Sequence, residues 1–203
     1  KGIKGMQTRE EDVVTKLFLS SNHSYLLYFT DMGRVYRTKT YNIPEAGRTA
    51  KGTPVVNIIE KSPEEKISEI IPVKEFSDNE YLVMVTKNGV IKKTPASEYE
   101  SIRKSGKIAI TLKEGDELIS IFKTTGNDNI FLATRNGMAI CFNENDARAV
   151  GRTASGVKAI DLADGDYVVG AEPVREDSKV LLVTDGGYGK CTDLTSFRIQ
   201  HRG

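Results

Sequence analysis

Clusters of arginine and lysine are the chemically most informative residues in this 203-residue sequence. One cluster is Arg103-Lys104-Ser105-Gly106-Lys107, and related segments around Arg48 and Arg152 precede and follow it. Several cations held on one surface suit a polyanion such as a nucleic-acid backbone, which presents regularly spaced phosphates and requires no sequence readout. Any single lysine is more often a solubilising group, so the interpretation depends on whether the clusters recur in register.

The total charge of the chain conceals these clusters. The formal net charge is only +1, yet residues 33–52 and 87–107 each carry a net charge of +4. Residues 53–86 and 159–184 each carry −4. Basic and acidic blocks therefore alternate along the chain, and folding can place them on different faces. We expect a basic stripe on a molecule that is nearly neutral overall.

Residues that could support catalysis or bind a metal are scarce. His23 and His201 are the only histidines, which disfavours a histidine metal site or a triad, and no carboxylate pair stands out as an acid–base couple. Residues 186–192, GGYGKCT, have only a faint similarity to a phosphate-binding loop, because Cys191 replaces the Ser or Thr that would bind Mg²⁺. Cys141 and Cys191 are interpreted as reduced strand residues. We expect no catalytic site, metal or cofactor in this domain.

Four related segments position the cations. Each has an apolar run that ends in Thr and is followed by a glycine turn: YLLYFT-DMG, YLVMVT-KNG, IFLAT-RNG and VLLVT-DGG. The turn glycines are Gly33, Gly89, Gly137 and Gly187. Such turns between strand-like runs indicate hairpins, because Asn and Gly tolerate positive φ. A basic loop follows each hairpin, and the four basic loops are residues 47–52, 103–107, 151–156 and 198–203.

The repeat predicts an all-β fold. After each basic loop come a short strand, an acidic turn and another apolar strand, and no stretch keeps helical apolar spacing over three turns. Four-stranded repeats of roughly 50 residues are typical of propeller blades, in which neighbouring sheets bury each other's faces. Residues 1–203 are therefore expected to form a single domain of about four such repeats. Since the chain begins at Lys1 without Met, we expect it to be part of a longer protein.

The ends and apolar runs of the chain indicate its environment. No run approaches the length of a membrane span, and the first residues do not resemble a signal peptide. We therefore expect a soluble, intracellular protein with no membrane partner.

Three segments resemble one family, the C-terminal domain of the bacterial DNA gyrase A protein. They are residues 43–52 (IPEAGRTAKG), 134–137 (TRNG) and 151–158 (GRTASGVK), and the resemblance covers essentially the whole chain in order. It implies a β-pinwheel, a propeller-like disc whose blades exchange strands and whose basic outer edge wraps duplex DNA. The family's Gln-Arg-Arg-Gly-Gly-Lys-Gly loop is mostly missing here, and only Lys1-Gly2 would match its end. Members usually have five or six blades, so four indicate a fragment.

The resemblance also implies a role. It implies a non-catalytic domain that bends and wraps DNA so that the gyrase holoenzyme introduces negative supercoils with ATP and Mg²⁺. The implied partners are double-stranded DNA, the remainder of the gyrase A protein, and the gyrase B protein, in a bacterial cytoplasm at the nucleoid. The related domain of topoisomerase IV is the near alternative. From the residues alone, a protein-interaction platform and an enzyme with a central-channel site stay open.

We predict that cations in register with the repeat contact the DNA backbone. In the third repeat Ile140 and Cys141 replace the cationic pair found at Lys92 and Lys93, so the basic surface is expected to be weakest there. The predicted contacts are Lys1, Arg34, Arg37, Lys39, Arg48, Lys51, Lys92, Lys93, Arg103, Lys104, Lys107, Arg152, Lys158, Lys190, Arg198 and Arg202.

Overall fold

The computed structural model covers the whole chain and describes all residues except 1, 4, 7, 9 and 10. Every regular element longer than one turn is a β-strand, and no α-helix occurs among the described residues. The predicted all-β class is therefore confirmed. Five short 3-10 helices lie between strands: η1 (Thr40–Asn42), η2 (Val55–Asn57), η3 (Ala96–Tyr99), η4 (Glu144–Asp146) and η5 (Leu194–Ser196).

Two antiparallel sheets have the predicted four strands. The first has the order β3-β1-β2-β6, formed by β3 (Ile67–Val73), β1 (Tyr25–Thr30), β2 (Arg34–Lys39) and β6 (Lys107–Ile108). The second has the order β10-β5-β4-β7, formed by β10 (Val157–Lys158), β5 (Val90–Pro95), β4 (Tyr81–Thr86) and β7 (Leu118–Thr124). In each sheet the central hairpin is one of the apolar-run and glycine-turn units of the sequence.

The other two sheets are smaller than predicted. The third has the order β11-β8-β9, formed by β11 (Val168–Pro173), β8 (Asn129–Thr134) and β9 (Ala139–Asn143). The fourth is the hairpin of β12 (Lys179–Val183) and β13 (Gly189–Asp193). The difference follows from strand exchange. Each outer strand comes from the segment after the next hairpin, since β6 pairs with β2 and β10 pairs with β5.

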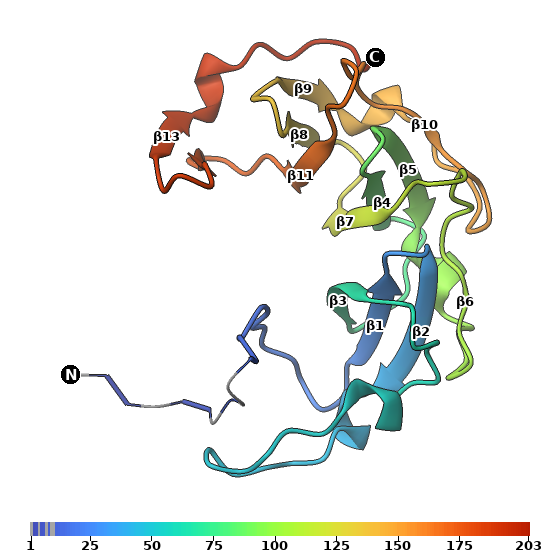
Figure 1. Ribbon diagram of the computed structural model, residues 1–203. Coiled ribbons are helices and arrows are strands. Elements are labelled where there is room, and N and C mark those ends of the chain that lie inside the picture. Colours follow the sequence, from blue (N-terminus) through green and yellow to red (C-terminus); the bar gives the residue numbers. More distant parts are fainter. Residues whose placement is uncertain (1, 4, 7, 9–10) are drawn as a thin grey trace.

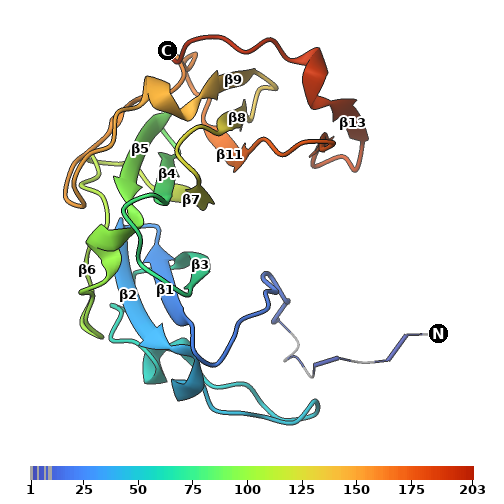
Figure 2. The same cartoon turned by 180° about the vertical axis from the view of Figure 1, so that it is seen from behind.

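The sheets follow one another along an open arc (Figures 1 and 2). In both views β3, β7 and β11 lie toward the concave side, and β6 and β10 lie on the convex side. The segments that carry the basic loops at 103–107 and 151–156 therefore run along the convex side. This arrangement has the blade exchange that the sequence resemblance implied.

The turn glycines allow the next repeat to approach. Gly33 and Gly89 have φ of +76° and +80°, a region that favours glycine. Their carbonyls accept hydrogen bonds from Ala109 N and Ala159 N at 2.8 and 2.7 Å. A Cβ on Gly33 would lie 2.7 Å from the carbonyl oxygen of Ile110. The glycine at this position therefore provides both the hairpin turn and the contact between repeats.

The core consists of facing sheets. Leu27 and Phe29 of the first sheet pack in one cluster with Met84 of the second. Val83 of the second sheet packs in another cluster with Leu132 of the third. Each inner strand is thus covered on both faces, which explains its continuous apolar sequence. The fourth hairpin has no such cover on β12, where Leu181 and Val183 are about two-thirds exposed.

Candidate nucleic-acid interface

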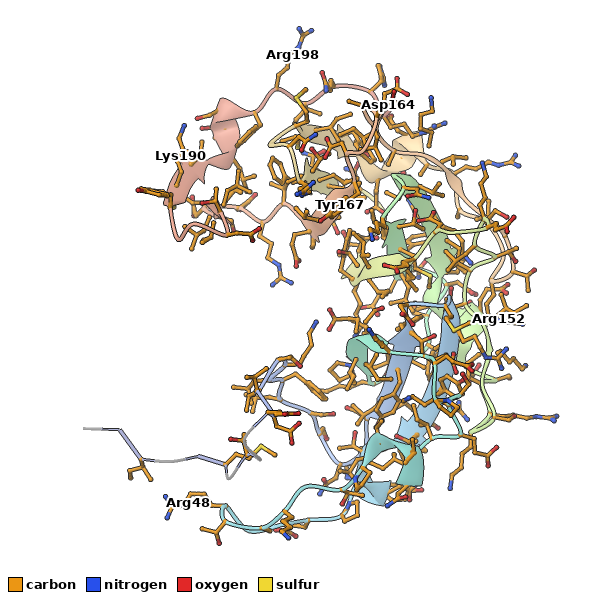
Figure 3. All side chains as sticks on the ribbon, in the orientation of Figure 1. Arg48, Arg152, Asp164, Tyr167, Lys190 and Arg198 are labelled. Atoms are coloured by element: carbon orange, nitrogen blue, oxygen red, sulfur yellow. The ribbon has the colours of Figure 1, made fainter. Side chains whose placement is uncertain are left out.

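The predicted cations differ in exposure and in the groups that they contact. Lys1 lies outside the described residues. Lys39 and Lys107 are half-buried. The exposed members are Arg48, Lys51, Arg103, Lys104, Lys158, Lys190 and Arg198. Figure 3 shows Arg48 near one end of the arc, Arg152 on the convex side, and Lys190 and Arg198 near the other end. The structure thus distributes these residues along the arc and does not gather them in one cleft.

Arg152 and Arg202 fasten exchanged strands and are only partly exposed. Arg152 donates from Nη1 to the carbonyl of Ile108 in β6. Arg202 donates from Nη1 to the carbonyl of Lys158 in β10 at 2.9 Å, and from Nε to the carbonyl of Asp146 at 2.8 Å. Each arginine therefore stabilises the short outer strand contributed by the preceding basic loop, and part of its hydrogen-bonding capacity is used inside the protein.

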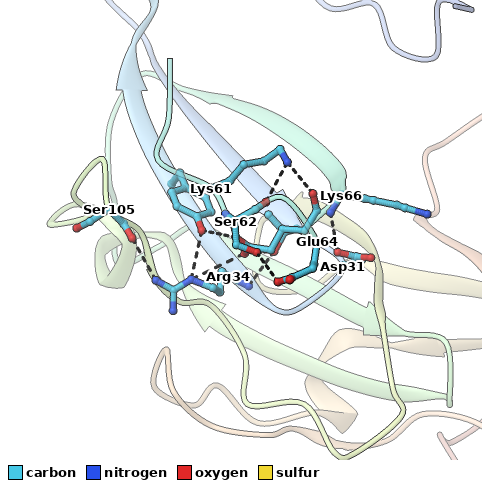
Figure 4. Close-up of polar contacts among 10 residues, drawn as sticks. Asp31, Arg34, Lys61, Ser62, Glu64, Lys66 and Ser105 are labelled. Atoms are coloured by element: carbon cyan, nitrogen blue, oxygen red, sulfur yellow. Dashed lines mark hydrogen bonds and ion pairs between the residues drawn. The ribbon is translucent and has the colours of Figure 1, made fainter. Parts of the chain in front are cut away.

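Arg34 belongs to a polar network that joins the first sheet to a basic loop (Figure 4). Its Nη2 donates to the carbonyl of Ser105 at 3.1 Å, and its Nε donates to the Tyr36 hydroxyl at 3.3 Å. The Tyr36 hydroxyl donates to Glu65 Oε2 at 2.6 Å. Thr30 Oγ1 donates to the other carboxylate oxygen at 2.9 Å. The basic loop at 103–107 is thereby tied to the segment around Glu65.

The charge of Glu65 is retained although its side chain is buried. Burial alone would raise its pKa, but hydrogen bonds from Tyr36, from the Ser62 amide and from Thr30, with the charge of Arg34, hold the pKa of Glu65 below its usual value. Burial, followed by the hydrogen bond to Glu65, raises the pKa of Tyr36. The network therefore contains a carboxylate and a neutral phenol at ordinary pH.

Arg37 and Lys39 lie over one aromatic ring. The guanidinium of Arg37 is 4.6 Å and the ammonium of Lys39 is 3.5 Å from the ring centroid of Tyr25. Arg37 also donates from Nη1 to the carbonyl of Glu100. These contacts orient both cations at the end of β2, and Lys39 keeps part of its surface in solvent.

Lys93 is not on the surface, and its prediction as a DNA contact is corrected. It is 5% exposed, and its ammonium lies 3.0 Å from the buried carboxylate of Glu144. Glu144 also accepts hydrogen bonds from Thr124 Oγ1 at 2.8 Å and from the amides of Gly126 and Asp128 at 2.9 and 2.7 Å. Lys93 therefore joins the second sheet to the third through a fully hydrogen-bonded ion pair.

Lys92 is also buried, at 1% exposed, so the prediction of a direct surface contact is corrected here too. Its ammonium donates to the carbonyls of Ala109 and Arg152. Burial, and then the positive charge of Arg152, lower the pKa of Lys92 to about 7, with Glu98 acting in the opposite direction. Lys92 therefore links the segments that follow two different hairpins.

The structure removes the reason for expecting the basic surface to be weakest in the third repeat. Ile140 and Cys141 are each 4% exposed, and they occupy interior positions like Lys92 and Lys93. These positions are covered by the following repeat, as shown by the parallel bridge from Cys141 to Ile199. Lys190 is exposed at the matching place in the fourth repeat because that hairpin lacks such cover.

The sequence prediction missed Arg148. This residue is exposed just before the Ala149 bridge to Lys93 on the outer side of the second sheet. Arg148 and Arg198 lie at the same distance after their turn glycines, so the repeat register contained the signal. Lys113, in the turn after β6, is another exposed cation outside the predicted set.

Other classes of site receive little support from the described part of the chain. In the described residues, no group of three or more His, Cys, Asp or Glu side chains could hold a metal ion. Among the described helices, none has the length and apolar character needed to cross a bilayer. A hollow of about 590 Å³ on the concave side is lined by residues such as Glu69, Phe131 and Glu172. Both cysteines are free thiols, as predicted.

Comparisons with known proteins agree on one family. The family model described as DNA gyrase C-terminal domain, beta-propeller, matches residues 1–21, 24–74, 80–125, 128–175 and 178–203. The DNA gyrase A protein of Staphylococcus epidermidis is 46% identical over 206 residues, which cover 100% of this chain and 23% of that protein. The DNA gyrase A protein of Ureaplasma parvum is 44% identical over 202 residues, covering 100% of this chain and 24% of that protein. The chain thus spans about a quarter of the length of these relatives.

Two solved structures have the same fold. The C-terminal domain of DNA topoisomerase IV superposes with a TM-score of 0.83 and 33% sequence identity, covering 89% of this chain and 57% of that chain. The DNA gyrase A C-terminal domain superposes with a TM-score of 0.75 and 26% identity, covering 90% of this chain and 59% of that chain. The predicted β-pinwheel class is therefore confirmed.

Proposed function

Since the chain belongs to the DNA gyrase A C-terminal domain family, we propose that it binds duplex DNA and wraps it around its convex side. The observation that carries the proposal is the set of exposed cations on segments between successive sheets, with Arg103, Lys104 and Arg148 as members. Such a set suits a phosphate backbone, which is continuous and needs no base contacts for affinity. DNA that follows a convex basic surface is bent by it.

The holoenzyme supplies the rest of the proposed activity. We propose that the domain itself is non-catalytic and presents a DNA segment of fixed chirality to the strand-passage parts of the gyrase A and gyrase B proteins. ATP and Mg²⁺ act in those other parts, and the outcome is negative supercoiling in a bacterial cytoplasm. Because the chain spans about a quarter of its relatives, this assignment extends beyond the residues of this domain.

The proposal is supported by the difference between arginines that bind the protein's backbone and cations that are exposed. Arg34, Arg152 and Arg202 donate to backbone carbonyls of the basic loops or of the strands that follow them. These bonds hold in place the loops that carry exposed cations such as Arg103 and Lys104. A charge that is held in place loses less side-chain and loop entropy when a phosphate binds.

Binding and wrapping are tested by separate measurements. Affinity for a duplex is measured from low to moderate salt, and log K is expected to fall linearly with log salt, with a slope of about −0.9 per phosphate neutralised. Wrapping is measured by relaxing circular DNA with a type I topoisomerase in the presence of the domain. Captured writhe is the expected result. A flat salt response would exclude phosphate contacts, and binding without writhe would leave only a binding module.

The superposition on the topoisomerase IV domain keeps a second holoenzyme role open. The gyrase role predicts a distinct product, negatively supercoiled DNA. Purified holoenzyme is incubated with relaxed plasmid and ATP, and negatively supercoiled product is expected. DNA that stays relaxed would favour the second role.

A further inference from the structure

The buried carboxylate of Glu65 lies at the end of a chain of hydrogen bonds that reaches the basic loop at 103–107. The Tyr36 hydroxyl donates to Glu65 Oε2 at 2.6 Å and accepts a hydrogen bond from Arg34 Nε at 3.3 Å. The same guanidinium lies 3.8 Å from Glu65 Oε1. It donates from Nη2 to the carbonyl of Ser105 in the loop at 3.1 Å (Figure 4). The carboxylate therefore orients the arginine that holds the loop.

The same loop also contacts two other groups close to Glu65. A Cβ on Gly106 would lie 2.5 Å from the ring of Tyr36, so the backbone of the loop lies directly against this ring. The amide of Glu60, which belongs to the same segment as Glu65, donates to the carbonyl of Lys104 at 3.2 Å. The ring contact, this hydrogen bond and the arginine together join the loop to the surroundings of one carboxylate.

The second repeat uses the same register position for a similar contact. Tyr36 lies three residues after its turn glycine, and Lys92 lies three residues after the next turn glycine. The ammonium of Lys92 donates to the carbonyl of Arg152 in the following basic loop. This position therefore contacts the next basic loop in both repeats. In the first repeat a phenol replaces the ammonium, and the bond to the loop carbonyl comes from Arg34, which the phenol and Glu65 orient.

We propose that Glu65 is a positioning residue for DNA binding. It acts through Arg34 on the loop at 103–107, whose exposed side chains Arg103 and Lys104 meet phosphates of the wrapped duplex. This inference rests on the proposed function, which supplies the duplex. A loop that is already held in place loses less entropy when a phosphate binds, so this buried carboxylate strengthens the binding of a polyanion.

The expected effect on duplex affinity has the opposite sign to that of charge alone. A carboxylate repels a polyanion, so removing an acidic charge ordinarily strengthens binding. Glu65→Gln is nevertheless expected to weaken duplex binding by about three- to tenfold, the range for loosening one or two ordered side chains. Glu64→Gln removes the same charge from the exposed neighbouring residue, and this matched control should not weaken binding.

Tyr36→Phe is a second variant, informative even if Glu65→Gln does not fold. It keeps the ring that lies against Gly106 and removes the hydroxyl between Glu65 and Arg34. Duplex binding is expected to weaken in the same direction, although this substitution changes no charge at neutral pH.

A combination of variants tests whether the effect passes through the loop. With Arg103 and Lys104 both replaced by Gln, Glu65→Gln should change duplex affinity by less than about twofold further, because the cations that it positions are absent. With Arg148→Gln, which lies outside this loop, Glu65→Gln should keep its full effect.

Hydrogen exchange distinguishes a local effect from a general loss of stability. The amide of Gly106 donates to the carbonyl of Arg103 at 3.0 Å, and its exchange should become faster in Glu65→Gln. The amide of Ala154 makes the equivalent bond to the carbonyl of Gly151 at 3.1 Å in the next basic loop, and its exchange should not change. Faster exchange at both amides would indicate general destabilisation and would count against the positioning role.

The two proposals fail in different measurements. Equal duplex affinity of the parent domain and Glu65→Gln would overturn the positioning role and leave DNA binding intact. The same conclusion would follow if the effect of Glu65→Gln were undiminished after Arg103 and Lys104 are neutralised. A parent domain that does not bind the duplex would overturn the proposed function, and with it the role inferred for Glu65.

Discussion

The function of each lysine in this chain depends on the position of its ammonium group. Lys92 and Lys93 are adjacent in β5, so their side chains point to opposite faces of the sheet. One face is covered by Ala109 and the loop of Arg152, and the other by Glu144. Both lysines are therefore structural groups, whereas the nearby Arg103 stays exposed.

Replacing Lys93 by Met is expected to destabilise the protein by about 3–5 kcal/mol, because Glu144 would remain as a buried charge without its cation. The free energy of unfolding is measured in urea. Replacing both residues, with Glu144→Gln, should recover part of this loss. Lys123→Gln, at an exposed site, serves as the control and should stay within about 0.5 kcal/mol of the parent. Equal stability of Lys93→Met and the parent protein would contradict the role given to the pair.

Lys92 makes stability depend on pH. The pKa of Lys92 is about 7 in the folded protein, below the 10.5 of a free lysine side chain, so between these values the unfolded chain binds more protons. The free energy of unfolding therefore rises with pH across this window as far as Lys92 contributes. The Lys92→Met variant should show a flatter dependence between pH 7 and pH 9, measured by urea unfolding. An unchanged slope would show that this ammonium does not titrate there.

At the scale of elements, the exchanged strands determine the geometry of the basic loops. Strands β6 and β10 have only two residues each, yet they close the outer edges of the first two sheets. Gly106 and Gly156 immediately precede these strands and have φ of +75° and +87°. A Cβ on Gly106 would lie 2.5 Å from the ring of Tyr36, and one on Gly156 would lie 2.5 Å from the carbonyl of Ile91. Both glycines let the loop approach the sheet closely.

Gly156→Ala is expected to destabilise the protein by about 1–3 kcal/mol, since it adds both a strained φ and a contact with backbone. Hydrogen exchange at Val157 and Lys158 should become faster, because the pairing of β10 with β5 is disturbed. Gly151→Ala, in the same loop but with open space around the added methyl group, is the matched control and should have little effect. Similar exchange rates in the two variants would refute the close-approach argument.

At the scale of the whole molecule, the net charge of +1 conceals an uneven distribution of basic and acidic residues. The exposed cations of the basic loops lie along the arc (Figure 3), and acidic residues concentrate in the intervening segments such as 53–86. The segment containing Glu65 is further fixed against the first sheet by its hydrogen bonds. Local positive potential, and not total charge, is therefore the quantity that governs binding to a polyanion.

Two triple variants that lose the same total charge distinguish the effect of local positive potential from the effect of total charge. Neutralising Arg103, Lys104 and Arg148 with Gln should make the slope of log K against log salt less steep by about 2 to 3. Neutralising three exposed lysines that lie outside the basic loops, with Gln at Lys74, Lys123 and Lys179, should change the slope much less. Duplex affinity at several salt concentrations measures both. Equal slopes would mean that only net charge matters and that the basic loops are not the binding surface.

The sequence alone determined the repeat, the all-β class and the hairpin turns, because these depend on local periodicity and on glycine at positions of positive φ. The family was indicated by the resemblance of residues 43–52, 134–137 and 151–158. The sequence also identified the loops that carry Arg103 and Lys104 and, through the register, contained the signal for Arg148. The tertiary structure decided which cations reach solvent. Lys93 is buried against Glu144 of η4, which follows the third sheet's β9, and Lys92 is buried because the Arg152 loop returns over it. Both contacts join residues that are about 50 or more positions apart, so no local pattern contains them.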